Sequence, residues 1–293
     1  MTRDALPGEL RLADVGREVQ LAGWVARRRD HGNLIFVDLR DRSGVAQLVF
    51  DPSRAPDAHR LAESWRPEYV VAVAGTVVAR DDATVNPELP TGQIEVKVAT
   101  AETLNAALTP PFEVEGGEGH DVDELLRLTY RYLDIRRPPM LARLELRHRA
   151  AQAARDYLNA HRFLEVETPV LTRSSPEGAR DFLVPSSMQP QHFYALPQSP
   201  QMFKQILMMA GVDRYYQLAR NFRDEDLRAD RQPEHTQIDV EMSFMDAAQI
   251  RALLEGLMAA VFAGAGATPP DLPLLTLSYD EAMLRYGSDK PDL

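Results

Sequence analysis

The sequence predicts an α+β protein of two domains, a small β-barrel followed by an antiparallel sheet flanked by helices. Short strands with turn residues between them fill the first hundred positions, a long amphipathic helix follows, and two alternating strands enclose a charged loop near residue 230. A length of 293 residues suits two domains, and 44% apolar residues can bury two cores.

The composition excludes several classes of protein and site. The chain has no cysteine, which excludes disulfides and cysteine-ligated zinc. We expect a cytoplasmic protein, because no stretch approaches the roughly 20 apolar residues that span a membrane and the N-terminus lacks signal-peptide features. The net charge of −11 argues against RNA binding over the whole surface, although a local patch can still bind RNA.

Residues 1–104 are expected to form the barrel. Turn signals separate five strand-like runs, and one helix is predicted between the third and the fourth: strands at 19–26, 33–39, 45–50, 69–78 and 93–98, and a helix at 55–64. This order is typical of the OB-fold, which often binds single-stranded nucleic acid. Phe36 could contact a base or lie in the core, because it alternates with Ile35 and only one face can point inward.

A linker at 105–128 and a second domain at 129–293 are predicted next. Prolines and glycines between 110 and 119 indicate the linker. Residues 140–160 predict an amphipathic helix, with its apolar positions at Leu144, Ala151, Ala154 and Leu158. A strand at 163–167 then ends at Thr168-Pro169, because proline cannot donate to a sheet.

Residues 216–244 predict two paired strands with one apolar and one polar face. We expect the apolar face to be buried and to carry Tyr216, Leu218, Phe222, Ile238, Val240, Met242 and Phe244. The other face would carry Gln217, Asn221, Arg223, Gln237, Asp239, Glu241 and Ser243. An arginine on one strand beside carboxylates on the next suits a ligand with anionic and cationic parts.

Three strings within this domain resemble those of the class II aminoacyl-tRNA synthetases, specifically the bacterial aspartyl type. They are FRDEDLRADRQPEHTQIDVE at 222–241, which resembles motif 2, and SPEGARD at 175–181 and LPQSPQMFK at 196–204. The helix, strand and proline at 140–169 resemble motif 1, which forms the dimer interface in that family. The resemblance covers nearly the whole chain, and relatives specific for asparagine or lysine fit the strings less well.

The resemblance implies an ATP-dependent ligase that makes aspartyl-adenylate from L-aspartate and transfers the aspartyl group to tRNA-Asp, with tRNA-Asn left open. It implies a partial class II catalytic sheet behind the barrel and a homodimer through motif 1, with no role at a membrane. Motif 3, the magnesium ligands and a second arginine lie beyond residue 293 in the family. We therefore expect this chain to be a fragment of a longer enzyme. We expect Mg²⁺ to bind only in the full-length enzyme and no residue of this chain to be a metal ligand. A non-catalytic module that binds tRNA or aspartate is the alternative.

The resemblance also implies how ATP is bound. Arg223 would be the catalytic group, holding the α-phosphate and the substrate carboxylate with its planar fork. Without the family, a surface ion pair of Arg223 with Asp224 or Glu225 is the simpler reading. The ATP contacts would be Arg223, Asp224, Glu225, Gln232 and His235. The family usually has phenylalanine at His235, stacked on adenine, so we expect weaker or pH-sensitive ATP binding here.

Residues 199–207 predict the helix that binds the amino acid. Ser199-Pro200 suit an N-cap and first turn. The buried face would carry Met202, Phe203, Ile206 and Leu207, and Gln201 and Lys204 would project from the other side. By resemblance, Lys204 meets the aspartate side chain, and the remaining aspartate contacts are Glu177, Ser199, Gln201, Arg223 and Asp239. The alternative is a solvated helix face.

The resemblance implies tRNA contacts in both domains. In the barrel, Phe36 would stack on an anticodon base, while Gln47 and Glu95 would read base edges. The further tRNA contacts would be Arg29, His31, Arg228 and Arg231. For the cluster Arg27–Arg29, a solvated strand end is the simpler reading.

Overall fold

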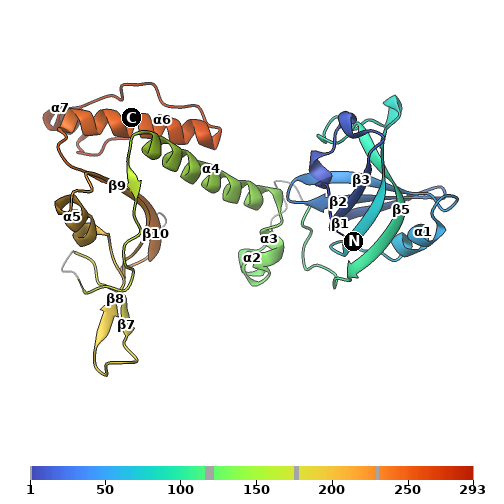
Figure 1. Ribbon diagram of the computed structural model, residues 1–293, viewed down its shortest axis with the longest axis horizontal. Coiled ribbons are helices and arrows are strands. Elements are labelled where there is room, and N and C mark those ends of the chain that lie inside the picture. Colours follow the sequence, from blue (N-terminus) through green and yellow to red (C-terminus); the bar gives the residue numbers. More distant parts are fainter. Residues whose placement is uncertain (1, 116–121, 175–177, 229–230, 293) are drawn as a thin grey trace. The chain divides into compact units, whose positions relative to one another are not determined.

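The computed structural model describes residues 2–115, 122–174, 178–228 and 231–292 (Figure 1). The chain forms two compact units, Met1–Arg143 and Leu144–Leu293. Their boundary lies inside the helix α4, Pro138–Ala160. The domain limits at 104 and 128 stay predictions.

The first unit contains a closed five-stranded barrel in the order β1-β2-β3-β5-β4, as the sequence predicted (Figure 1). Its strands are β1 Glu18–His31, β2 Leu34–Asp41, β3 Gly44–Phe50, β4 Val70–Ala79 and β5 Ile94–Asn105. The helix α1, Pro56–Glu63, lies between β3 and β4, and three short 3₁₀ helices lie at Pro7–Glu9, Leu12–Asp14 and Asp82–Thr84. β5 is seven residues longer than predicted at its end.

Alternate side chains of the five strands fill the barrel. Val37, Leu39, Leu48 and Phe50 are fully buried, and Trp65 packs edge-on against the Phe50 ring at 5.4 Å between centroids. The Trp65 indole nitrogen donates to Thr103 Oγ1 at 2.8 Å, so its polar atom is paired. Burial of this kind, at about 25 cal/mol per Å² of apolar surface, is the main stabilising term of the barrel.

Two short helices follow the barrel, α2 Glu124–Thr129 and α3 Arg131–Asp134. Asp134 is fully buried, and its carboxylate accepts hydrogen bonds from Arg127, Arg131 and Arg137. Burial alone would raise the pKa of Asp134, but the hydrogen bonds and charges of these arginines outweigh it and lower the pKa. This buried carboxylate therefore stays ionised and joins α2, α3 and the residues that precede α4.

The second unit is built on a three-stranded sheet in the order β10-β9-β6. β9 Arg214–Phe222 and β10 Glu234–Met242 are antiparallel, and β6 Leu164–Glu165 lies parallel to β9. β6 is shorter than the predicted strand at 163–167. A separate hairpin pairs β7 Leu183–Pro185 with β8 Phe193–Ala195, and the remaining helices are α5 Gln201–Met209, α6 Ala247–Ala265 and α7 Tyr279–Tyr286.

The helices α4 and α6 lie side by side and share a core with the sheet (Figure 1). Ala154 and Leu158 of α4 pack with Tyr216 of β9 and with two leucines of α6. A Cβ at Gly256 of α6 would lie 2.1 Å from the Tyr157 hydroxyl, so glycine permits this close approach. Only the second half of α4 is buried in this way, since Leu144 is 49% exposed.

α6 corrects the expectation that no stretch approaches the length of a membrane span. By length and composition alone it could cross a membrane, with a mean hydropathy of 1.3. Its ends are those of an ordinary helix, a capping box of Asp246 with Gln249 and a left-handed Gly266. Leu253 and Leu257 are buried against α4, although only 11% of the apolar stretch is buried within the described structure.

Candidate active site on the strand pair β9–β10

The register of β9 and β10 puts the predicted polar residues on one face. Tyr215 pairs with Glu241, and Gln217 pairs with Asp239. On the opposite face Tyr216 packs in the core, and Val240 and Met242 pack against it. The predicted division of the two faces is therefore confirmed at this end of the strands. It is wrong for Ile238 and Phe244, which are 42% and 98% exposed, because Phe244 lies beyond the end of β10 at Met242 and no described helix buries Ile238. The register produces a square of four residues on the polar face, which we call the site square: Tyr215, Gln217, Asp239 and Glu241.

Lys204 of α5 lies against the site square. Its ammonium is 2.8 Å from Asp239 Oδ1 and 3.3 Å from Glu241 Oε2, and the Lys204 and Asp239 side chains are only 11% and 12% exposed. Burial alone would lower the pKa of Lys204, but the hydrogen bonds and charges of both carboxylates outweigh it and raise the pKa. The lysine is therefore a cation held in place, with one of its three donors not used by these carboxylates.

Two acceptor atoms on the polar face have no partner. Asp239 Oδ2 and Asn221 Oδ1 are buried and make no hydrogen bond to any described residue. Buried polar atoms are almost always paired, with protein, water or ligand. A ligand or water that brings N–H or O–H groups to this face is therefore expected, and an ammonium group fits that requirement.

Tyr215 and Thr168 both donate to Gln217 on this face. The Tyr215 hydroxyl lies 2.7 Å and the Thr168 hydroxyl 3.0 Å from Gln217 Oε1. Burial raises the pKa of Tyr215, and the charges of Asp239 and Glu241 raise it further. The Tyr215 phenol therefore stays protonated and acts as a donor.

The helix α5 differs from the prediction in two respects. Its N-cap is Pro200, whose carbonyl accepts from the Lys204 backbone N–H at 3.0 Å, and no side chain caps it, so Ser199 is not the N-cap. Met202 and Ile206 are 56% and 51% exposed, so the predicted buried face is wrong for these two residues. The reason is that α5 covers the polar face of the sheet, which turns its lysine inward.

The other predicted aspartate contacts lie near the start of α5. Ser199 and Gln201 line a small cavity together with Asp181 and Gln198. Gln198 is buried and donates to the Ala179 carbonyl at 2.8 Å, which fixes this segment. Glu177 lies outside the described residues.

Arg223 follows β9, and its backbone N–H donates to the Pro233 carbonyl at 2.8 Å. Its guanidinium makes no ion pair with a described residue, so the pairing with Asp224 or Glu225 is not seen. Asp224 lies 4.0 Å from Arg180 instead. The Arg223 fork is thus available to a ligand.

The remaining ATP and tRNA candidates of this unit lie along the loop after β9. Glu225 and Gln232 are exposed, and His235 is half-buried across from Asn221. Arg228 and Arg231 are exposed and are joined by two backbone hydrogen bonds of 3.3 and 3.1 Å. Glu225, Arg228, Arg231 and Gln232 thus lie between β9 and β10, whereas His235 belongs to β10.

The barrel carries a second candidate site, a cavity of about 660 Å³ lined by Phe36, Gln47 and Glu95. Gln47 donates to Glu95 at 3.1 Å, and Arg29 donates to Gln47 at 3.3 Å. Ile35 is 3% exposed and belongs to the barrel core, so the choice between Ile35 and Phe36 is settled in favour of an outward Phe36. His31 ends β1, is exposed and is not among the residues that line this cavity.

Sequence reasoning missed two cations of this cavity, Arg54 and Lys97. Lys97 alternates with the buried Val96 and Val98, so an outward position was readable from the sequence. Arg54 lies in the irregular segment before α1, where no periodicity indicates its direction.

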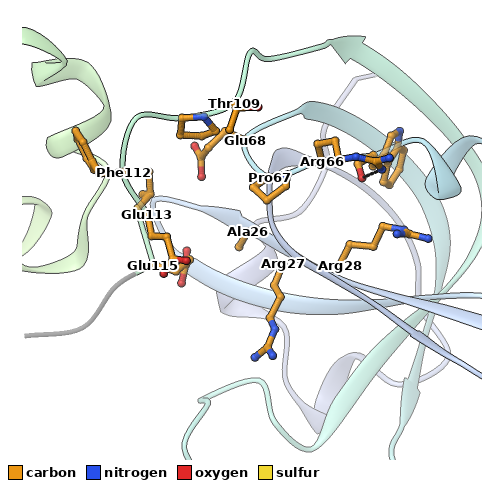
Figure 2. A pocket seen from close by; sticks show the side chains of 13 residues that line it. Ala26, Arg27, Arg28, Arg66, Pro67, Glu68, Thr109, Phe112, Glu113 and Glu115 are labelled. Carbon is orange, nitrogen blue, oxygen red and sulfur yellow. Dashed lines mark hydrogen bonds between the residues drawn. The ribbon is translucent and has the colours of Figure 1, made fainter. Parts of the chain in front are cut away.

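A cavity of about 860 Å³ lies beside the barrel, between the turn before β4 and the segment 109–115 (Figure 2). Figure 2 shows Glu113 and Glu115 at one end of it and Arg66 at the other. The buried Glu68 at its wall accepts from Arg40 at 2.7 and 2.9 Å and from Arg136 at 2.7 Å. Arg136 also lies 4.7 Å above the Trp24 ring. This network holds the residues before α4 on the barrel.

Within residues 2–115, 122–174, 178–228 and 231–292, no group of three or more histidines or acidic residues could hold a metal ion. The nearby pair Asp239 and Glu241 is occupied by the Lys204 cation. We therefore assign no described residue to Mg²⁺.

Comparisons with known proteins identify a family for each part of the chain. Residues 123–293 match the family described as tRNA synthetases class II (D, K and N), and residues 19–104 match the OB-fold nucleic acid binding domain. The aspartate–tRNA(Asp/Asn) ligase of Moorella thermoacetica is 62% identical over 98% of this chain and 47% of its own length. The aspartate–tRNA ligase of Geobacillus kaustophilus is 55% identical over 100% of this chain and 49% of its own.

A solved structure shares the fold. The asparaginyl-tRNA synthetase of Pyrococcus horikoshii, complexed with asparaginyl-adenylate, aligns with a TM-score of 0.78 at 26% identity, over 90% of this chain and 58% of that one. The chain thus spans about half the length of the curated relatives it matches. Because the family match covers more than half of its residues, the chain belongs to the class II tRNA synthetases of the D, K and N group.

Proposed function

We propose that this chain binds L-aspartate and ATP as part of an aspartate–tRNA ligase. The observation that carries the proposal is the buried Lys204 ammonium beside Asp239 and Glu241. It offers a fixed cation to an acidic side chain, and the unpaired Asp239 Oδ2 offers an acceptor to an ammonium group. The curated relatives with 55–62% identity carry the name of such ligases.

Selection of the amino acid would rest on charge. The third donor of Lys204 would bind the side-chain carboxylate of aspartate, and an uncharged analogue would leave this desolvated cation short of a partner. Asp239 would accept from the α-ammonium. Glu177, Ser199 and Gln201 would complete the binding of the amino acid.

In the first step an α-carboxylate oxygen attacks the α-phosphorus of ATP, the bond to the β-phosphate oxygen breaks, and pyrophosphate leaves. Arg223 would hold the α-phosphate and the attacking carboxylate with two parallel hydrogen bonds. Loss of such a contact costs about 100- to 1000-fold in rate. The ATP would also be contacted by residues of the loop after β9 and of β10: Asp224, Glu225, Gln232 and His235. Mg²⁺ would neutralise phosphate charge in the whole enzyme.

In the second step a ribose hydroxyl of tRNA attacks the acyl carbon, and AMP leaves. The barrel would bind the anticodon, with Phe36 stacked on a base and with Gln47 and Glu95 at base edges. The further tRNA contacts would be Arg29, His31, Arg228 and Arg231. We infer tRNA-Asp as the partner, with tRNA-Asn as a second one, since the Moorella relative is named for both. We also infer a cytoplasmic homodimer that pairs through α4 and β6.

The alternative is that this chain binds tRNA and aspartate without forming the adenylate. The two candidates differ in one reaction. Aspartate-dependent exchange of pyrophosphate into ATP requires the adenylate, whereas binding does not.

Calorimetric titration of this chain with aspartate, asparagine and lysine tests the binding that both candidates need. We expect aspartate to bind far more tightly than asparagine or lysine. Equal binding of all three amino acids, or of none, would contradict the proposal. Pyrophosphate exchange with the same three amino acids then separates the ligase from the binding module.

A further inference from the structure

Gln217 lies directly across the strand pair from Asp239, in the centre of the polar face. We propose that Gln217 is a specificity-determining residue: its side-chain N–H groups donate to a carboxylate oxygen of the substrate and disfavour a carboxamide. The inference rests on the proposed function and adds a residue that would bind the side-chain carboxylate of aspartate.

The position of Gln217 places it beside the lysine that would bind the same carboxylate. Side chains at directly opposed positions of an antiparallel pair have Cβ atoms about 4.5–5.5 Å apart. Asp239, the opposed residue, is the one that holds the Lys204 ammonium at 2.8 Å. An oxygen that takes the third Lys204 donor therefore lies within reach of the Gln217 side chain.

The orientation of the Gln217 amide follows from its partners. Its oxygen accepts from the Tyr215 hydroxyl at 2.7 Å and from the Thr168 hydroxyl at 3.0 Å. Tyr215 is fully buried, and its hydroxyl has no other hydrogen bond to a described residue. A flipped amide would leave this buried phenol hydrogen without an acceptor, which is costly. Tyr215 therefore holds the oxygen of Gln217 toward itself.

The amide nitrogen is left for a ligand. In the described part of the chain it makes no hydrogen bond, and it is not among the buried unpaired atoms, so it reaches open space. Its two N–H groups can only donate. They can form hydrogen bonds with an oxygen of a carboxylate, carbonyl or phosphate, but not with another N–H group.

Discrimination follows from the fixed amide. A carboxylate offers acceptor oxygens to both Lys204 and Gln217. A carboxamide offers one oxygen, and its NH₂ would face a donor on the other side. A free glutamine could flip and accept from that NH₂, but the bond from Tyr215 opposes the flip.

The test is the ratio of the dissociation constants of L-asparagine and L-aspartate, measured by calorimetry on the full chain. In Gln217→Glu the donor becomes an acceptor, so aspartate binding weakens about 10- to 100-fold, as expected for a hydrogen bond to a charged group. Asparagine binding does not weaken, and the ratio falls. In Tyr215→Phe only the Thr168 hydroxyl still contacts the amide, and a hydroxyl can accept as well as donate. The amide can then flip, so asparagine binds tighter and the ratio falls about 10-fold. Gln205→Glu, an exposed glutamine of α5, is the matched control.

The outcomes separate this inference from the proposed function. Wild-type chain that binds no aspartate overturns both. Wild-type chain that binds aspartate, with a ratio unchanged in Gln217→Glu and in Tyr215→Phe, overturns the role of Gln217 alone. A merely structural role would weaken both ligands equally and leave the ratio constant. If Gln217→Glu fails to fold, as judged by thermal melting, Tyr215→Phe decides.

Discussion

The Lys204 ammonium lies 2.8 Å from the Asp239 carboxylate, and both side chains are nearly nine-tenths buried. Desolvation makes such a pair a weak source of stability, although removal of one partner is costly. Lys204 and Asp239, 35 positions apart, thus join α5 to β10 by an ion pair. A pair of apolar side chains of similar size could stabilise the same contact as well. The arrangement is better explained by binding of a charged ligand than by stability.

Alkaline pH tests the charge state of this face. The pKa of Lys204 is raised, so its contribution to stability is present below the unfolded value of about 10.4 and is lost as the pH rises through the folded value. The raised pKa of Tyr215 acts in the same direction, from an unfolded value of about 10. We expect the free energy of unfolding to fall above about pH 10, and to fall less in Lys204→Met and in Tyr215→Phe. Urea unfolding at several pH values measures this, and an identical slope in all three proteins would contradict it.

Glu68→Gln tests the network beside the barrel. Glu68 is 4% exposed and serves both Arg40 and Arg136. Loss of its charge leaves the buried Arg40 with only Glu115, so we expect the free energy of unfolding of the barrel unit to fall by about 3–5 kcal/mol. Chemical denaturation measures this. The control Glu88→Gln, at an exposed residue, should change the free energy of unfolding by less than about 0.5 kcal/mol. Equal changes in the two variants would show that the Glu68 network does not stabilise the barrel unit.

Phe36→Ala tests the barrel cavity as the anticodon site. Stacking of a base on an aromatic ring contributes about 1–3 kcal/mol, so affinity for tRNA-Asp should fall by that amount. Filter binding at one fixed salt concentration is the measurement, because RNA affinity depends strongly on salt. Phe193→Ala in β8, 57% exposed and remote in the chain, is the control. Equal affinities of the Phe36 and Phe193 variants would rule the cavity out.

His235→Phe tests the departure from the family pattern at the adenine position. The larger aromatic ring should bind ATP more tightly, because it offers more area for stacking on adenine. We expect the variant to have a higher ATP affinity than the wild type at the same pH. Fluorescent-nucleotide titration measures both, with the exposed His192→Phe as control. Equal ATP affinities of the wild type and His235→Phe contradict the expectation.

Alternation in the sequence was sufficient to predict the strand pair and the sides on which its residues lie, but not the exposure of Ile238 and Phe244. Each face has period two, so Asp239 and Gln217 had to share a side once the strands paired. The short strings of the family resemblance then indicated Lys204 as the residue that meets this face. The structure was needed to show that Ile35 points inward and Phe36 outward. Alternation shows that the two side chains lie on opposite faces but does not tell which face is buried.

Other features have no local signal. Apolar positions of α5 predicted its buried face wrongly at Met202 and Ile206, because periodicity does not tell which surface the helix covers. The Glu68 network joins residues 28 and 68 positions apart, and such separations leave no pattern within a sequence window. The Gln217 amide likewise accepts a hydrogen bond from Thr168, which is 49 positions away.

The most direct test of the account is the dissociation constant of L-aspartate for the wild-type chain and for Lys204→Met, measured by calorimetry near neutral pH. Lys290→Met, an exposed lysine, serves as control, and Lys204→Arg keeps the charge if the methionine variant melts early. We predict that wild type and Lys290→Met bind aspartate equally and that Lys204→Met binds at least about 30-fold more weakly. Equal binding by a folded Lys204→Met chain would contradict the claim that this buried ammonium recognises an acidic substrate.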